Sequence, residues 1–129
     1  MHWSADYVGL PFLATGRDRA GVDCYGLVAL CYREVRGIVL PSYTGHYTSI
    51  DERAEIAAAL NAGKAAWTRV DAAREWDVVL FSGAVGACHV GLVVAPGRML
   101  HTSSGHDSRI ERYEAPQWRR RLMGVYRRS

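Results

Sequence analysis

The chain has 129 residues, 49% of them hydrophobic and 22% charged, a composition that suits one globular domain spanning residues 1–129. Its net charge of +3 is modest, so the composition does not require nucleic acid, and none is predicted as a partner. No apolar run approaches the roughly 18 residues of a membrane span, and residues 1–6 lack the basic and apolar regions of a secretory signal. We therefore expect a soluble protein that is made in the cytoplasm.

The first elements in the chain lead to a cysteine. Residues 7–21 contain several glycines and a proline, which predicts an irregular segment. Asp23 then suits a helix N-cap, and apolar residues recur at three-to-four spacing up to the stop signal at Gly37. The pattern predicts a helix over residues 24–36 that begins at Cys24.

The rest of the chain predicts another helix and then a sheet. Ser49 and Glu52 form a capping box ahead of an alanine-rich run, which predicts a helix to Leu60. Alternating and β-branched residues predict strands over residues 77–81, 89–94, 98–102 and 122–126. Helices followed by strands indicate an α+β fold.

The cysteines provide the first indication of chemistry. Three cysteines, an odd number at irregular positions, argue against a disulfide scaffold. Cys31 on the helix and Cys88 on a strand are interpreted as structural. Cys24 lies in the first turn of a helix, where backbone N–H groups and the helix dipole favour a thiolate. Because the carboxylate of Asp23 would oppose this effect, a nearby imidazolium is needed, and His89 is the leading candidate.

A second histidine follows on the next predicted strand. Whether His89 and His101 share a face of the sheet depends on the turn at residues 95–97. An even-length loop would separate the two histidines, whereas a three-residue loop pairs Val94 with Arg98 and aligns them. We predict the three-residue loop, with Gly97 in its left-handed third position, so that His101 accepts the ring N–H of His89.

At this point the sequence resembles the NlpC/P60 family of cell-wall peptidases. The resemblance is carried by five motifs in the family's order, namely Gly9-Leu10-Pro11-Phe12, Asp23-Cys24-Tyr25-Gly26-Leu27-Val28, Trp76-Asp77-Val78-Val79-Leu80-Phe81, His89-Val90-Gly91 and Met99-Leu100-His101. The resemblance implies a papain-like fold in which the helix with the nucleophile packs on an antiparallel sheet. The variant form of the motifs is most similar to phage tail-associated members.

The resemblance also implies an active site and a substrate. It implies Cys24, His89 and His101 as the catalytic triad. We predict no cofactor and no metal. It implies hydrolysis of peptidoglycan stem peptides, usually between D-glutamate and the following diamino acid. Because residues 1–6 lack a secretory signal, we predict that a partner particle, such as a phage-like tail tip, carries the protein to the cell wall. Residues near the nucleophile are expected at the substrate, namely Tyr7, Phe12, Asp23 and Tyr25.

The sequence departs from the family at Phe12, where many members carry a tyrosine whose hydroxyl serves the active site. Tyr7 and Tyr25 are the candidates to replace this hydroxyl, and backbone N–H groups near Cys24 are the alternative. Tyr25 stands where the family usually has a serine, which would narrow the cleft.

Three other interpretations stay open. A zinc site could use Cys24, Cys88, His89 and His101, although their spacing lacks a recognisable zinc pattern. A structural tail-hub module would keep the fold with little or no hydrolysis. An acyltransferase would pass the same thioester to an acceptor other than water.

Overall fold

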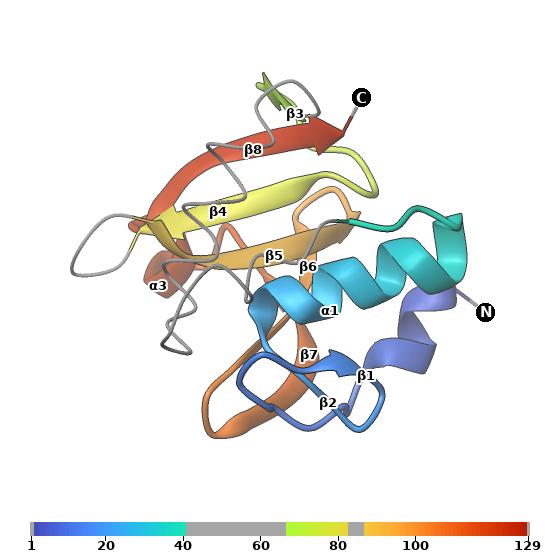
Figure 1. The fold of residues 1–129 in the computed structure, drawn as a ribbon. Coiled ribbons are helices and arrows are strands. Elements are labelled where there is room, and N and C mark those ends of the chain that lie inside the picture. The colour runs from blue at the N-terminus through green and yellow to red at the C-terminus, as the bar shows by residue number, and fades with distance from the viewer. Residues whose placement is uncertain (1, 41–66, 83–86, 129) are drawn as a thin grey trace.

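A computed structural model describes residues 2–40, 67–82 and 87–128 of the chain. The predicted helix over residues 49–60 lies outside these residues. A central helix packs against a six-stranded antiparallel sheet (Figure 1). The sheet has the strands, in spatial order, β3 (Trp67–Val70), β8 (Leu122–Arg128), β4 (Val78–Ser82), β5 (Ala87–Ala95), β6 (Arg98–Ser103) and β7 (His106–Arg112). This arrangement confirms the α+β prediction.

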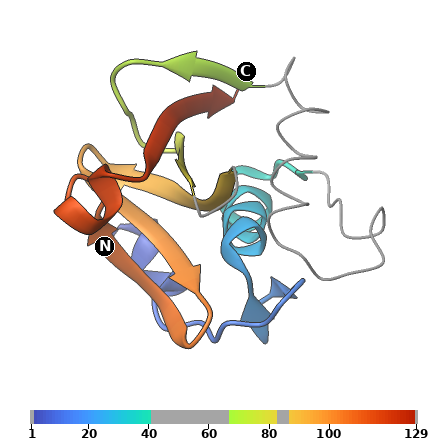
Figure 2. The same cartoon turned by 90° about the vertical axis from the view of Figure 1, so that its left-hand side faces the viewer.

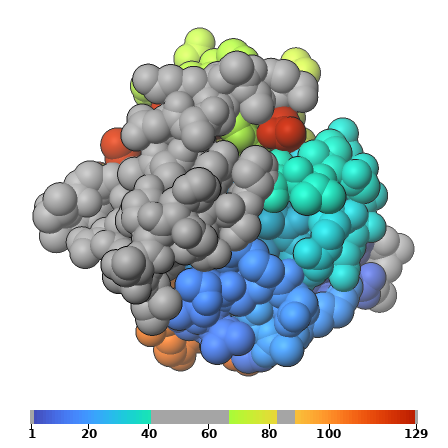
Figure 3. All heavy atoms as spheres, in the orientation of Figure 1, coloured from blue at the N-terminus to red at the C-terminus, as the bar shows by residue number. Residues whose placement is uncertain are grey.

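The N-terminal segment is more regular than its glycine content predicted. A 3-10 helix, η1, covers Trp3–Tyr7, and a small hairpin pairs β1 (Arg17–Asp18) with β2 (Gly21–Val22). This hairpin contacts the central helix, and Figure 3 shows the N-terminal residues in blue beside the helix residues in cyan on one face of the molecule.

The central helix has two parts. The α-helix α1 covers Cys24–Cys31, and a π-helical turn, η2, continues it over Tyr32–Arg36. The helix ends at Gly37, whose φ of 67° is the left-handed conformation that glycine adopts at helix ends. The predicted helix over residues 24–36 is therefore confirmed, with a change of helical type in its second half.

The two faces of the sheet carry separate apolar clusters. Leu92, Leu100 and Leu80 belong to the cluster that packs with α1. Val93 and Met99 alternate with them and belong to the second cluster, which includes Trp118 of the short helix α3 (Pro116–Arg119). Figure 2 shows α3 and α1 on opposite sides of the sheet. Because successive residues of a strand point to opposite faces, both faces of the central strands are buried.

The sequence prediction missed β3 and β7 and was wrong in the detail of one turn. β3 and β7 are the two edge strands, where one face meets solvent and apolar alternation is weak. In the β5–β6 hairpin, Leu92 pairs with Leu100, as predicted, but Arg98 pairs with Ala95 rather than Val94. The register shifts by one residue between Val93 and Ala95. A two-residue turn with a bulge therefore produces the same alignment as a three-residue loop.

Within the described residues, no helix is long and apolar enough to cross a membrane.

Candidate active site

Cys24 is the first residue of α1 and is fully buried. Asp23 caps the helix, as predicted, and accepts a hydrogen bond from the Gly26 backbone N–H at 2.7 Å. The same carboxylate accepts from the Thr15 backbone N–H at 3.0 Å and from Arg17 Nη1 at 2.8 Å. These donors offset the negative charge of Asp23, so its opposition to a Cys24 thiolate is weaker than the sequence implied.

A close backbone approach holds this arrangement together. A Cβ atom built on Gly26 would lie 2.0 Å from the Gly16 carbonyl oxygen and 2.8 Å from Arg17 Nη1. Only glycine lets the loop before β1 lie directly on the first turn of α1. This contact brings Arg17 to Asp23 and explains why glycine stands two residues after Cys24.

The two predicted histidines are in direct contact. Nε2 of His89, on β5, lies 2.8 Å from Nδ1 of His101, on β6. His101 is fully buried and His89 is 6% exposed. The prediction that His89 and His101 share one face of the sheet is therefore confirmed. Because His101 contacts Nε2 of His89, a further partner of the His89 ring must use Nδ1.

Both imidazoles are neutral at pH 7 in this environment. Burial lowers the pKa of His89 to about 3, assisted by the neighbouring His101 and Arg121. Burial, with the positive charge of Arg109, lowers the pKa of His101 to about 4. The lowered pKa therefore does not support the preformed imidazolium beside Cys24 that the sequence suggested.

Two residues that the sequence did not indicate surround the histidine pair. The indole of Trp118 stacks on His89 with ring centroids 5.1 Å apart and meets the ring of His101 edge-on at 4.9 Å. Its Nε1–H donates to Glu111 Oε2 at 2.7 Å, and Glu111 Oε1 lies 3.4 Å from His101 Nε2. Glu111 lies on β7 and Trp118 on α3, elements that the sequence prediction lacked.

The helix and the histidine pair involve the same two strands of the sheet, β5 and β6. α1 packs against both β5 and β6, and Figure 1 shows α1 beginning near the end of the sheet where β5 begins and α3 lies. His89 and Cys24 both lie near the start of their elements. The histidines pack with Trp118, whose apolar cluster lies on the face of the sheet opposite α1.

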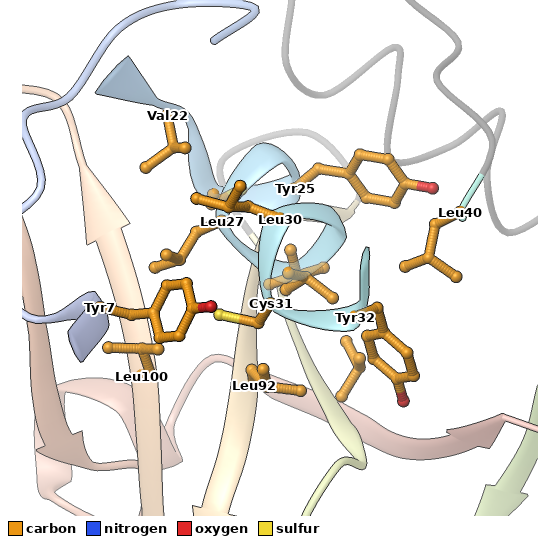
Figure 4. Close-up of a cluster of buried hydrophobic side chains, with 14 of the residues drawn as sticks. Tyr7, Val22, Tyr25, Leu27, Leu30, Cys31, Tyr32, Leu40, Leu92 and Leu100 are labelled. Atoms are coloured by element: carbon orange, nitrogen blue, oxygen red, sulfur yellow. The ribbon is translucent and has the colours of Figure 1, made fainter. Parts of the chain in front are cut away.

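The structure does not bring Tyr7 to Cys24. Its hydroxyl donates to Glu34 Oε1 at 2.9 Å, and Figure 4 shows it pointing toward the sulfur of Cys31. Cys31 lies about two helical turns from Cys24. Burial and the Glu34 carboxylate raise the pKa of Tyr7 to about 12. Tyr7 is therefore a core residue here and does not supply the hydroxyl that Phe12 lacks.

The other residues expected at the substrate lie close to α1. Phe12 is half-buried and forms an isolated bridge with Val22, just before Asp23. Tyr25 is 8% exposed, with the guanidinium carbon of Arg17 5.5 Å from its ring centre. Asp23 and Tyr25 thus flank Cys24 in the chain, and Phe12 bridges to the residue before Asp23.

The other two cysteines lie on α1 and β5. Cys31 is fully buried in the α1 cluster, and burial raises its pKa to about 12, which supports its interpretation as a structural residue. Cys88 belongs to β5, but its side chain lies outside the part of the chain that the structure describes.

A buried cysteine at the start of a helix, packed against an antiparallel sheet with a histidine pair, defines a papain-like α+β domain. The NlpC/P60 family matches residues 9–127, and the chain belongs to this family. Its fold is similar to an NlpC/P60 family protein from Bacillus cereus ATCC 10987, with a TM-score of 0.72 and 21% identity over 97% of this chain and 37% of that one. The NlpC/P60 domain of the peptidoglycan hydrolase SagA has a TM-score of 0.62 and 21% identity, covering 95% of this chain and 90% of that chain.

Two curated relatives carry names that describe an activity. The murein DD-endopeptidase MepS/murein LD-carboxypeptidase of Escherichia coli K12 is 26% identical over 121 residues, covering 94% of this chain and 57% of the relative. The gamma-DL-glutamyl hydrolase of Bacillus subtilis 168 is 26% identical over 124 residues, covering 94% of this chain and 27% of that protein. This chain therefore spans only part of the length of these relatives.

Proposed function

We propose that this protein is a cysteine peptidase that hydrolyses peptidoglycan stem peptides, with Cys24 as nucleophile. The observation that carries the proposal is the 2.8 Å contact between His89 and His101 on strands that pack against the helix beginning at Cys24. A nucleophile, a base and a group that orients the base are the parts of a covalent hydrolase site. The names of the two curated relatives support a cell-wall or glutamyl peptide substrate.

The proposed reaction begins with proton transfer from the Cys24 thiol to His89 Nδ1. The thiolate attacks the scissile carbonyl, and the imidazolium of His89 protonates the departing amine as the peptide bond breaks. Water then attacks the thioester and loses a proton to neutral His89, which releases the acid and restores the thiol. Throughout the cycle, His101 Nδ1 accepts the Nε2–H of His89 and holds its ring.

The proposed bond is the one between D-glutamate and the diamino acid. The name of the Bacillus subtilis relative, a gamma-DL-glutamyl hydrolase, supports this choice. The name of the Escherichia coli relative includes DD-endopeptidase and supports the peptide cross-link as the alternative. The two bonds give products of different mass from the same muropeptide.

Purified muropeptides test the function. The wild-type protein, Cys24→Ala and the matched control Cys31→Ala are incubated with cross-linked and linear muropeptides, and products are identified by mass spectrometry. We expect cleavage by the wild type and by Cys31→Ala, because Cys31 lies in the helix core, and none by Cys24→Ala. An inactive wild type that is folded would reject the peptidase and favour a structural module, whereas joined products would indicate acyl transfer.

We further propose that the protein acts as part of a phage-like tail tip that carries it to the cell wall. The variant form of its motifs, with Tyr25 after the nucleophile and Trp76 before Asp77, supports this role through its similarity to tail-associated members. Particles purified from the producing cells should contain the protein by mass spectrometry. Its recovery only in particle-free fractions would count against this role.

A further inference from the structure

His101 Nε2 faces a carboxylate at the end of the histidine pair. Nε2 is buried and has no hydrogen bond of normal geometry within the described residues, yet Glu111 Oε1 lies 3.4 Å away. Glu111 is held in place because Trp118 Nε1 donates to its Oε2 at 2.7 Å and Arg109 Nε donates to its Oε1. Although burial raises the pKa of Glu111, these hydrogen bonds hold it below its usual value, so the carboxylate is charged at pH 7.

The contact between the histidines allows two arrangements of protons. In the first, His89 donates its Nε2–H to His101 Nδ1, and His101 carries its own proton on Nε2. In the second, His101 donates from Nδ1 and His89 carries its proton on Nδ1, so that His89 Nδ1 cannot accept a proton from a thiol. A neutral imidazole has one N–H, so these two tautomer pairs exclude each other.

The carboxylate discriminates between the two arrangements. In the first, an N–H of His101 points toward Glu111 and is attracted to it. In the second, the lone pair of His101 Nε2 faces a negative charge at 3.4 Å, with no hydrogen between them. The first arrangement is therefore the stable one, and it is the one that leaves His89 able to act as a base.

We propose that Glu111 is a positioning residue that fixes the tautomer of His101 and, through it, the base form of His89. The site would then be a relay of four groups, with Glu111 behind Cys24, His89 and His101. This inference rests on the proposed function for its catalytic consequence, but the tautomer itself exists without substrate. Trp118 supports this positioning, because it donates a hydrogen bond to Glu111 and stacks on His89.

The charges around the pair determine the expected pH effect. His89 on β5 and His101 on β6 lie near three other charged groups, Arg109 and Glu111 of β7 and Arg121 before β8. Arg109 lowers the pKa of both histidines and Arg121 that of His89, whereas Glu111 raises the pKa of both. Loss of the Glu111 charge therefore makes an imidazolium harder to form in the reaction.

The first test reads the tautomer directly. Ring nitrogen shifts of 15N-histidine-labelled protein distinguish Nδ1–H from Nε2–H by long-range proton–nitrogen NMR. We expect His101 as the Nε2–H tautomer in the wild type and an increased Nδ1–H population in Glu111→Gln. The control is Glu114→Gln, which removes the same charge from an exposed position three residues away and should leave the spectrum unchanged. An Nδ1–H tautomer in the wild type, or no change in Glu111→Gln, would overturn the proposal.

The second test is kinetic. In Glu111→Gln we expect kcat/KM on the muropeptide to fall by roughly tenfold or more, as for loss of a charge-assisted contact. The acid limb of its pH profile should move to lower pH, because the carboxylate raises the pKa of both histidines. A loss of folding alone would lower the rate without moving that limb. An inactive wild type would reject the proposed function and leave the NMR test to decide on Glu111.

Discussion

The indole of Trp118 lies nearly parallel to the imidazole of His89, at an angle of 20° and a centroid distance of 5.1 Å. Trp118 is 8% exposed and comes from the short helix α3, almost thirty residues after His89 in the sequence. The stacking covers one side of the imidazole and keeps water from it. It helps to explain why burial lowers the pKa of His89 to about 3.

Trp118 is therefore expected to support both stability and activity. Trp118→Ala should lower the free energy of unfolding by about 3–5 kcal/mol, the usual cost of removing a buried aromatic ring. Trp118→Phe keeps a stacking ring but loses the donor to Glu111, so kcat/KM should fall while the protein stays folded. Urea unfolding and muropeptide cleavage measure the two effects. Trp67→Phe, at the edge strand β3, is the control, and an equal loss of activity in both Phe variants would contradict this role.

The free energy of unfolding should fall as the pH is lowered from about 6.5 toward 4. The pKa values of His89 and His101 are about 3 and 4 in the folded protein, below the ordinary value of 6.5, so the unfolded chain binds more protons in this range. Each histidine then contributes a slope of roughly 1.4 kcal/mol per pH unit, with stability rising with pH. Urea unfolding between pH 7 and 4.5 measures the slope.

A variant distinguishes the contribution of these histidines to the slope from that of the carboxylates, which also titrate at acidic pH. His101→Asn should reduce the slope of stability against pH. His106→Asn, at an exposed position, is the control. Equal slopes in the wild type and His101→Asn would mean that His101 titrates normally in the folded protein.

Asp23 should matter more for folding than a helix cap alone. Asp23→Ala removes the acceptor for Gly26 N–H and Thr15 N–H and the ion partner of Arg17, so we expect a loss of roughly 2–4 kcal/mol in unfolding free energy. Asp23→Asn keeps an acceptor oxygen and should lose less. Asp18→Ala, at the exposed end of β1, is the control, and a comparable loss there would show that the Asp23 contacts contribute little.

Tyr7→Phe should change stability without changing catalysis. Removing the hydroxyl deletes its hydrogen bond to Glu34, which we expect to cost about 1 kcal/mol. Because the hydroxyl lies beside Cys31, kcat/KM on the muropeptide should stay within about twofold of the wild type. A large drop in kcat/KM at unchanged stability would indicate that Tyr7 acts at the substrate site after all.

Much of the secondary structure could be predicted because its signals are local. The cap at Asp23, the apolar spacing of α1 and the stop at Gly37 lie within one segment, and α1 with η2 occupies that segment. The buried strands β4 and β5 carry nearly continuous apolar residues and were also predicted. The edge strand β7 was not, because its burial pattern includes mostly exposed and half-buried positions.

The sequence by itself determined the residue types of the proposed site. Cys24 at a helix start and two histidines at the spacing of one hairpin can be identified without coordinates, because caps and strand alternation depend on near neighbours. Only the tertiary structure decided how the hairpin aligns its histidines, that Tyr7 binds Glu34, and that Glu111 and Trp118 surround the imidazoles. These relationships join residues that are distant in the chain, and they follow from packing and strand register, which local sequence does not specify.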